Sequence, residues 1–428
     1  QQMRKYFGTD GIRRIANTEL TPELVYKVAK AGAYVLSKHT DHAPTIFIGR
    51  DTRISGTLIE SAMTAGFLSY GANVKMLGVM PTPAVAYLTK KFKADASVVI
   101  SASHNTFEFN GVKYFSNKGM KIPDELEEEI EEVMDSGKIN ELTAVNDKIG
   151  TSEIATELLD EYVYFFRKNF EEDLERLNRD DFVVAVDTAN GATSVVADKV
   201  FTVLGIKHHI LNDSPNGINI NDGCGSTHLE MLKQYVIDKK CSLGIAYDGD
   251  GDRCLAVDEN GNEIDGDKII AIISQYLKSK GKLNKDTIVA TVMSNLGLNK
   301  YAKQNELNFV QTKVGDRYVL EEMLKNGYNL GGEQSGHVIC LDYNPTGDGI
   351  LTSLMIIRAI LEQGKKASEV ASIMKAYPQV LINAKVSSDK KYDFDKDEEI
   401  KSAIEKLNKE FDGNGRVLIR ASGTEPLV

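Results

Sequence analysis

The sequence predicts an α/β protein of several domains, in which mixed or parallel sheets carry helices on both faces. Short apolar segments rich in β-branched residues alternate with amphipathic segments almost throughout the chain. Such alternation favours sheets that are covered by helices on both sides. The chain has 428 residues, which corresponds to about three domains of roughly 150 residues each and leaves room for four smaller ones.

The first part of the chain contains two predicted strands and two predicted helices. We expect a strand over 45–49 and a helix over 57–69. The segment 96–101 is expected to be a buried strand, because it is continuously apolar and rich in β-branched residues. An acidic helix over 123–135 and a polar stretch over 136–152 then indicate a domain boundary.

The pattern restarts twice. The second round has a strand over 182–186, a helix over about 191–204 and a strand over 242–247. The third has a helix over 266–279, a strand over 287–292 and a helix over 316–325. Further boundaries are expected near 254–266 and near 365–376.

The last segment has a different pattern, with a strand over 379–387, a charged helix over about 395–411 and a strand over 416–420. We therefore divide the chain into domains at 1–152, 153–255, 256–370 and 371–428. The sequence stops directly after a motif at 420–426, which suits a last domain that is cut short.

Composition excludes two classes of partner. The net charge of −11 argues against nucleic acid, whose phosphates are held by clustered Lys and Arg. No apolar run reaches the ~18 residues that a membrane-spanning helix needs. The four cysteines show no CxxC spacing and indicate reduced thiols, and the start of the chain lacks an apolar leader. We therefore expect a cytoplasmic protein.

The strongest chemical signal is the loop that carries Asp248, Asp250 and Asp252. Three carboxylates two residues apart can converge on a hard cation, and an all-oxygen set suits Mg²⁺. One alternative is a solvated Asp-Gly turn. An EF-hand is rejected, because Arg253 occupies the position where that loop needs Gly and the flanks are strand-like. The positively charged Arg253 next to this cation site is explained if an anion such as phosphate also binds there.

A second loop, 101–105, follows the predicted buried strand and contains Ser103 and His104. A serine at a strand end is a candidate nucleophile or phosphate carrier, whereas an ordinary Ser/Asn turn is the alternative. Because neighbours on an extended strand point to opposite faces, a Ser–His pair is not assured. Lys113 is a second candidate base, which requires that its pKa be lowered; the alternative is a solvated lysine.

Two more loops carry polar groups between glycines. In the loop over 331–337, Glu333 can accept from two sugar hydroxyls and Ser335 can donate or accept. In the loop over 420–426, Arg420 offers a bidentate fork for phosphate, and the residues that follow supply neutral donors. Each loop alone could equally be a turn.

Taken together, these motifs resemble the α-D-phosphohexomutase superfamily, and within it the branch that acts on glucosamine phosphate. The segment 7–13 (Phe-Gly-Thr-Asp-Gly-Ile-Arg) resembles the N-terminal motif of that branch. The other matching segments are 101–105, 248–253, 312–317, 332–337 and 420–426. They span essentially the whole chain.

The resemblance implies four domains around a central cleft: three related mixed-sheet α/β domains and a smaller C-terminal α+β domain that acts as a lid. It implies that Ser103 is phosphorylated and that one Mg²⁺ per site is bound by the phosphoserine and the three aspartates. Candidate helpers in acid–base or electrostatic roles are Arg13, His104 and Lys113. The residues implied in substrate binding are Arg253, Glu333, Ser335, His337, Arg420, Ser422, Gly423 and Thr424.

The activity implied is the interconversion of glucosamine 6-phosphate and glucosamine 1-phosphate through glucosamine 1,6-bisphosphate, which feeds the synthesis of UDP-N-acetylglucosamine and cell-wall precursors. A kinase or autophosphorylation would prime Ser103, and a homodimer is compatible with the pattern. The alternatives are a phosphomannomutase or phosphoglucomutase, a phosphatase, and a non-catalytic protein that binds sugar phosphates.

Overall fold

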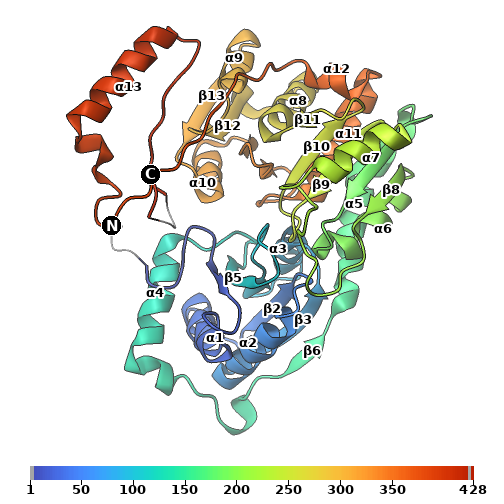
Figure 1. The fold of residues 1–428 in the computed structure, drawn as a ribbon. Coiled ribbons are helices and arrows are strands. Elements are labelled where there is room, and N and C mark those ends of the chain that lie inside the picture. The colour runs from blue at the N-terminus through green and yellow to red at the C-terminus, as the bar shows by residue number, and fades with distance from the viewer. Residues whose placement is uncertain (1–3, 423–425) are drawn as a thin grey trace.

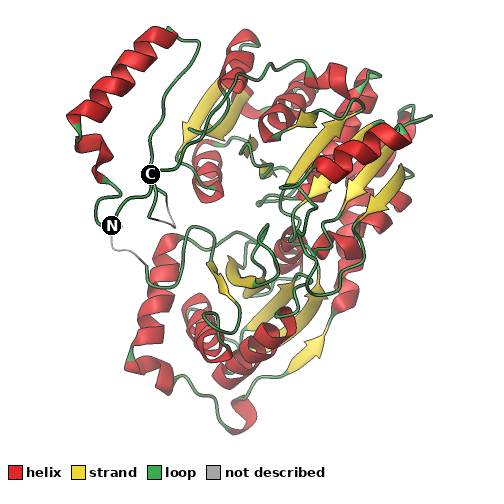
Figure 2. Ribbon diagram, in the orientation of Figure 1, coloured by secondary structure: helices red, strands yellow, loops and turns green. Residues whose placement is uncertain are grey.

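The computed structural model describes residues 4–422 and 426–428. Figure 1 shows three α/β units arranged in chain order, with a C-terminal helix set apart from them, and Figure 2 shows each unit as a sheet with helices packed against it. The predicted fold class, three mixed-sheet α/β domains followed by a C-terminal domain, is confirmed. None of the described helices is long and apolar enough to cross a bilayer.

The first sheet has six strands. Its strands, in spatial order, are β1 (Ile12–Ile15), β5 (Phe109–Ser116), β4 (Ala96–Ile100), β2 (Thr45–Arg50), β3 (Asn73–Val79) and β6 (Ser152–Ile154). Its helices are α1 (Pro22–Ser37), α2 (Gly56–Tyr70), α3 (Thr82–Lys91) and α4 (Asp124–Asp135). Every residue of β4 is buried, as expected for a strand covered on both faces.

The second and third sheets have five and four strands. The second runs in the order β11 (Glu263–Ile264), β10 (Cys254–Asp258), β9 (Leu243–Tyr247), β7 (Val183–Asp187), β8 (Lys207–Leu211), with helices α5 (Leu159–Arg176), α6 (Ala197–Val203) and α7 (Glu230–Lys239). The third runs in the order β13 (Asn308–Thr312), β12 (Thr287–Thr291), β14 (Leu330–Gly332), β15 (Val338–Cys340), with helices α8 (Gly266–Ser279), α9 (Leu296–Gln304), α10 (Asp316–Asn326), α11 (Gly349–Gln363) and α12 (Ala367–Ala371).

The three sheets share one arrangement. In each, a parallel pair (β2 and β3, β7 and β8, β12 and β13) lies beside an antiparallel hairpin (β4 and β5, β9 and β10, β14 and β15), whose first strand runs parallel to its neighbour. The connection within each hairpin carries one of the predicted chemical loops. A strand, a polar loop and a second strand therefore recur three times.

The helices of the second and third units share one core with part of the first. Tyr162, Phe166 and Phe170 on α5 are fully buried and belong to a hydrophobic cluster that also includes residues of α3 and α11. Because this packing joins units far apart in sequence, it fixes the three hairpin loops relative to one another. The predicted helix over 191–204 is interrupted: a short 3-10 turn over Ala192–Val195 precedes α6.

In the last segment the predicted helix is present and the predicted strands are not. Helix α13 (Glu398–Phe411) begins after Asp397, whose side chain caps the first turn. Among the described residues, 379–387 and 416–420 form no strand, and only an isolated bridge joins Lys385 to Leu427. The apolar stretch Val380, Leu381 and Ile382 is exposed. A strand requires a hydrogen-bonded neighbour along its length, which this extended segment lacks.

Candidate active site

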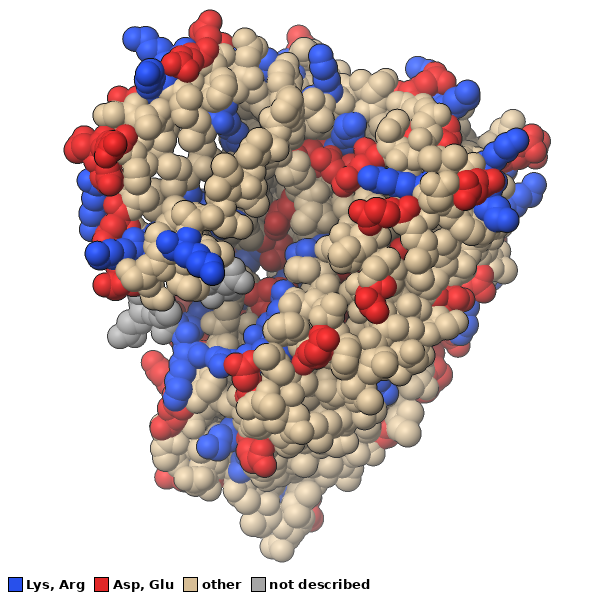
Figure 3. All heavy atoms as spheres, in the orientation of Figure 1, with Lys and Arg blue, Asp and Glu red and all other residues tan. Residues whose placement is uncertain are grey.

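The serine loop, the aspartate loop and the 331–337 loop come together in the folded chain, and their backbones approach each other closely at two glycines. A Cβ added to Gly249 would lie 2.5 Å from the Ser103 carbonyl oxygen, and one added to Gly336 would lie 2.4 Å from the Cys254 carbonyl oxygen. Glycine at these positions therefore lets the aspartate loop pack between the serine loop and the 331–337 loop. In the space-filling view the face of the molecule is hollowed between the units, with acidic and basic side chains on the walls (Figure 3).

Asp248, Asp250 and Asp252 form a buried cluster, with one oxygen from each within 4.8 Å of the others. Burial first, and then repulsion from Asp252 and Asp250, raise the pKa of Asp248 well above its usual range. Burial would also raise the pKa of Asp250, but the nearby Lys113 ammonium and hydrogen bonds from Lys113 and Thr82 lower it below its usual range. Like charges held this close indicate a place for a cation.

The donor set fits a hard divalent cation. The Oδ1 atoms of Asp250 and Asp252 are buried and have no hydrogen-bond partner, which is costly unless a ligand satisfies them. All three side chains offer carboxylate oxygens, the ligands that Mg²⁺ prefers. In the described residues this is the cluster whose carboxylates converge in the way that a metal site requires.

Ser103 lies beside this cluster. Its hydroxyl donates to Asp248 Oδ2 at 3.0 Å, and its side chain is buried. The residue adopts a left-handed backbone conformation with φ 54°, which costs about 1–3 kcal/mol for a residue with a Cβ. The surrounding structure therefore holds this serine in place against its own backbone preference.

A buried arginine supplies much of that support. Arg53 donates to the carbonyl oxygens of Ser103 at 3.0 Å, Asn105 at 2.9 Å and Thr106 at 2.6 Å, and pairs with Asp51 at 2.9 Å. The Asp51 carboxylate also accepts from the Ser101 hydroxyl at 2.6 Å. These contacts bind the serine loop to the end of β2.

The second unit supplies a further support. The Asn221 side-chain amide donates to the carbonyl oxygens of Ser103 at 2.8 Å and Asn105 at 2.9 Å. Sequence analysis missed Asp51, Arg53 and Asn221. The charged segment 50–53 directly after the predicted strand was the available signal for the first two; Asn221 lies in an irregular loop and offered none.

The three candidate helpers contact the serine and aspartate loops, and His104 differs from the two cations Arg13 and Lys113 in charge. His104 accepts from Arg253 through Nδ1 at 3.3 Å, and burial, followed by the charges of Arg253 and Arg13, lowers its pKa to about 4. The imidazole is therefore neutral near pH 7. Arg13 donates to Asn105 Oδ1 at 3.2 Å and pairs with Asp10 at 2.7 Å.

Lys113 is held as a cation. It lies 2.9 Å from Asp250 and 3.4 Å from Asp10. Burial alone would lower the pKa of Lys113, but the carboxylates of Asp10 and Asp250 raise it above its usual range. The lowered pKa that a general base requires is therefore not found, and the geometry favours the electrostatic alternative for this residue.

The candidate residues of the 331–337 loop differ in burial and in their contacts. His337 is buried, lies 3.7 Å from Asp252 and has no hydrogen bond at either ring nitrogen. Burial, and then the charge of Asp316, raise the pKa of Glu333. Ser335 is exposed. The Gln334 amide donates to Asp265 at 3.3 Å and to Gln379 at 3.0 Å, so it contacts the segment that leads to α13.

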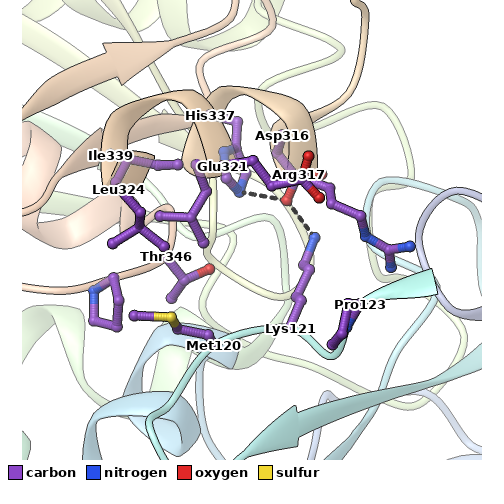
Figure 4. A pocket seen from close by; sticks show the side chains of 12 residues that line it. Met120, Lys121, Pro123, Asp316, Arg317, Glu321, Leu324, His337, Ile339 and Thr346 are labelled. Carbon is purple, nitrogen blue, oxygen red and sulfur yellow. Dashed lines mark hydrogen bonds and ion pairs between the residues drawn. The ribbon is translucent and has the colours of Figure 1, made fainter. Parts of the chain in front are cut away.

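A chain of ion pairs across the site was also missed from the sequence. Lys121 pairs with Asp10 of the first unit at 2.7 Å and with Asp316 of the third at 2.5 Å. Asp316 in turn lies 3.4 Å from His337. Figure 4 shows Lys121 and His337 both directed at Asp316. Asp10 and Asp316 lie in matched motifs, but their side chains meet only in the folded chain.

The predicted phosphate loop lies on the C-terminal segment. Arg420 is exposed, and the Ser422 amide donates to the Leu427 carbonyl oxygen at 2.9 Å. Gly423 and Thr424 lie outside the described residues. Arg253, by contrast, belongs to the aspartate loop itself: its amide donates to Asp248 Oδ1 at 3.2 Å.

Comparison with known proteins agrees with this architecture. Models for phosphoglucomutase/phosphomannomutase match along the chain: alpha/beta/alpha domain I at residues 4–141, domain II at 160–261, domain III at 265–377 and the C-terminal domain at 381–428.

Individual relatives match over nearly their whole length. A phosphoglucosamine mutase of Ruminiclostridium cellulolyticum is 53% identical over 426 residues, covering 100% of this chain and 94% of the relative. A solved phosphoglucomutase/phosphomannomutase family protein of Burkholderia thailandensis has a TM-score of 0.76 at 20% identity, covering 91% of this chain and 84% of that one. An N-acetylphosphoglucosamine mutase of Aspergillus fumigatus, solved in complex with GlcNAc-6P and magnesium, has a TM-score of 0.66 at 17% identity, with coverage of 99% and 91%.

Proposed function

The chain belongs to the phosphoglucomutase/phosphomannomutase family of the α-D-phosphohexomutase superfamily, and we propose that it works as a phosphoglucosamine mutase through phospho-Ser103. The activity, an intramolecular phosphotransfer of the isomerase class, rests on full-length identity of 53% to curated phosphoglucosamine mutases. The role of Ser103 rests on one observation above all: its buried hydroxyl lies 3.0 Å from Asp248, at the edge of an acidic cluster.

In the proposed reaction the phosphoserine oxygen–phosphorus bond breaks and a bond forms to the 1-hydroxyl of glucosamine 6-phosphate. The sugar hydroxyl loses its proton and the Ser103 oxygen gains one as glucosamine 1,6-bisphosphate forms. The intermediate then reverses its orientation in the cleft. The Ser103 hydroxyl takes the 6-phosphate, which leaves glucosamine 1-phosphate. Because phosphoryl transfer depends mainly on alignment and charge neutralisation, the supports given to Ser103 by Arg53 and Asn221 are central to the proposal.

Asp248, Asp250 and Asp252 would hold one Mg²⁺ together with an oxygen of the phosphoserine. That ion would supply charge neutralisation of the transferring group. Lys113 keeps Asp250 ionised, since the pair lies 2.9 Å apart, and so maintains the carboxylate as a ligand. The neutral His104 belongs to the serine loop and could exchange a proton with the reacting oxygens. The charged Arg13, which donates to Asn105 of the same loop, could orient them electrostatically.

The remaining loops would bind the substrate. We propose that Glu333, Ser335 and His337 contact the sugar, and that Arg253 contacts phosphate near the cluster. Arg420, Ser422, Gly423 and Thr424 would hold the non-reacting phosphate on a lid formed by 371–428, while 1–152, 153–255 and 256–370 carry the serine, metal and sugar loops. Closure of a lid over the bisphosphate would retain it during turnover.

The test is the conversion of glucosamine 6-phosphate to glucosamine 1-phosphate with Mg²⁺ and catalytic amounts of bisphosphate. Ser103→Ala should lose turnover by orders of magnitude. Ser61→Ala, which removes an exposed hydroxyl from α2 of the same unit, should keep it. Equal turnover by Ser103→Ala and the wild type would eliminate the phosphoserine role, whereas turnover of glucose or mannose phosphates alone would reassign the substrate.

A further inference from the structure

The proposed substrate differs from its glucose analogue at one position, where an amine replaces a hydroxyl. An amine of this kind has a pKa near that of an α-amino group, about 8, so it is largely an ammonium at pH 7. A carboxylate that faces the sugar would therefore favour glucosamine phosphate over glucose phosphate by a charge-assisted hydrogen bond. This inference rests on the proposed function.

Asp316 has the geometry that such a role requires. It is the first residue of α10, directly after Gly315, and its side chain is 18% exposed. Its Oδ2 atom faces both Lys121 and His337. Within residues 4–422 and 426–428, the Oδ1 atom has no hydrogen-bond or ion-pair partner and is not among the buried atoms. One carboxylate oxygen is therefore free and accessible.

The Asp316 carboxylate lies beside the 331–337 loop. His337, which we propose contacts the sugar, is 3.4 Å from Asp316, and Glu333 is close enough for the charge of Asp316 to raise its pKa. Asp316 and His337 also line a cavity of about 110 Å³ between the first and third units (Figure 4). Two carboxylates near one sugar loop form a place where an ammonium is favoured over a hydroxyl.

Glu333 is assigned to the sugar in the proposed function, and the other carboxylates near the sugar loop already have partners or tasks. Asp252 belongs to the metal cluster. The Asp265 side chain accepts from the Lys268 amide and from Gln334. Asp267 is fully buried and accepts from the Asn295 amide at 2.8 Å. The Lys121 ammonium does not fully neutralise the charge of Asp316, because it also pairs with Asp10.

We propose that Asp316 is a specificity-determining residue, which accepts a hydrogen bond from the 2-ammonium group of glucosamine phosphate through its free oxygen. Lys121 and His337 hold the carboxylate in place from the opposite oxygen. Glucose phosphate, with a neutral hydroxyl at this position, gains only a weaker contact.

The experiment compares kcat/KM for glucosamine 6-phosphate with kcat/KM for glucose 6-phosphate. Asp316→Asn should lower this ratio about 10- to 100-fold, the range expected for a hydrogen bond to a charged group, with little change for glucose 6-phosphate. Lys121→Met removes one tether but keeps the carboxylate, so its ratio should fall less than that of Asp316→Asn. Glu321→Gln, on the same helix and lining the same cavity, is the matched control and should keep the wild-type ratio.

An unchanged ratio in Asp316→Asn would overturn the inference. So would an equal fall of kcat/KM for both sugars in Asp316→Asn and in Lys121→Met, because Asp316 would then only hold Lys121 in place. Turnover of neither sugar by the wild type would overturn the proposed function and this inference with it.

A measurement on the wild type alone avoids any folding defect. The ratio should fall as pH rises through about 8, where the substrate amine loses its proton. The titratable or charged groups around Asp316 are Asp10, Lys121, Arg317, Glu321, Glu333 and His337. They act on both sugars, so they largely cancel in the ratio. A ratio independent of pH from 6 to roughly 9 would contradict the contact.

Discussion

Replacement of Arg53 tests whether a buried ion pair holds the serine loop. The Arg53 side chain is fully buried and donates to three carbonyl oxygens of that loop as well as to Asp51. Arg53→Met would leave the Asp51 carboxylate buried and unpaired, together with those carbonyls. Breaking a buried pair in this way costs about 3–5 kcal/mol, a large share of the 5–15 kcal/mol that stabilises a typical domain.

The assay is the thermal midpoint of unfolding, followed with a single-turnover measurement of phosphoryl transfer. At about 2–4 °C per kcal/mol for a unit of this size, Arg53→Met should lower the midpoint by roughly 6–20 °C. Arg53→Lys keeps the charge but cannot reach all the carbonyls, because a lysine lacks the planar fork. It should lose less stability and still slow the transfer.

Arg50→Met is the matched control. Arg50 also lies at the end of β2, but it is 21% exposed, pairs with Glu60 at a longer 3.3 Å and, among the residues that the structure describes, donates to no carbonyl of the serine loop, so its loss should lower the midpoint less than the loss of Arg53. Equal midpoints for Arg53→Met and Arg50→Met would refute the reasoning, since the buried pair would then contribute no more than a partly exposed one.

Three further predictions follow from other contacts. Asp250→Asn removes a carboxylate from the cluster and takes one ion-pair partner from Lys113. The Mg²⁺ affinity measured by calorimetry should therefore fall at least about tenfold, the lower limit for groups that only support a metal ligand. An unaltered affinity would exclude Asp250 as a ligand. Asn221→Ala removes two hydrogen bonds to the serine loop and should slow phosphoryl transfer about 10-fold or more, and an unchanged single-turnover rate would show that the loop needs no support from the second unit. Burial raises the pKa of Asp267 to about 7, so the folded chain holds that proton more tightly than the unfolded one, and the stability it contributes is complete below about pH 4 and lost as pH rises through 7. Asp267→Asn should therefore raise the thermal midpoint relative to the wild type at pH 8 and not at pH 4, and an equal effect at both would contradict the shift.

The sequence predicted the hairpin units well because their strands are continuously apolar. The predicted helix over 266–279 coincides with α8, and the buried strand over 96–101 with β4. The loops that carry Ser103 and the aspartates were also predicted, because each places polar residues directly after an apolar strand. The prediction of strands over 379–387 and 416–420 was wrong, because an apolar run forms a strand only where another segment pairs with it.

The supports of the site could not be read from the sequence for a different reason. Lys121 is 111 residues from Asp10 and 195 residues from Asp316 in the sequence. A charged residue in a loop resembles any solvated one until its partner is known. The same holds for Lys113, whose proximity to Asp250 makes it a fixed cation although the sequence allowed a base. Local pattern reports which residues are polar, whereas the charge state depends on neighbours that the fold provides.

The most direct test of the account is phosphate transfer from the serine itself. The enzyme would be exposed to glucosamine 1,6-bisphosphate and Mg²⁺, freed of excess ligand, mapped by peptide mass spectrometry, and then mixed with glucosamine 6-phosphate in a single turnover. We predict one phosphate on Ser103 that passes to the sugar as the bisphosphate forms. A phosphate on another residue, or a phosphorylated Ser103 that does not transfer to the sugar, would contradict the central claim.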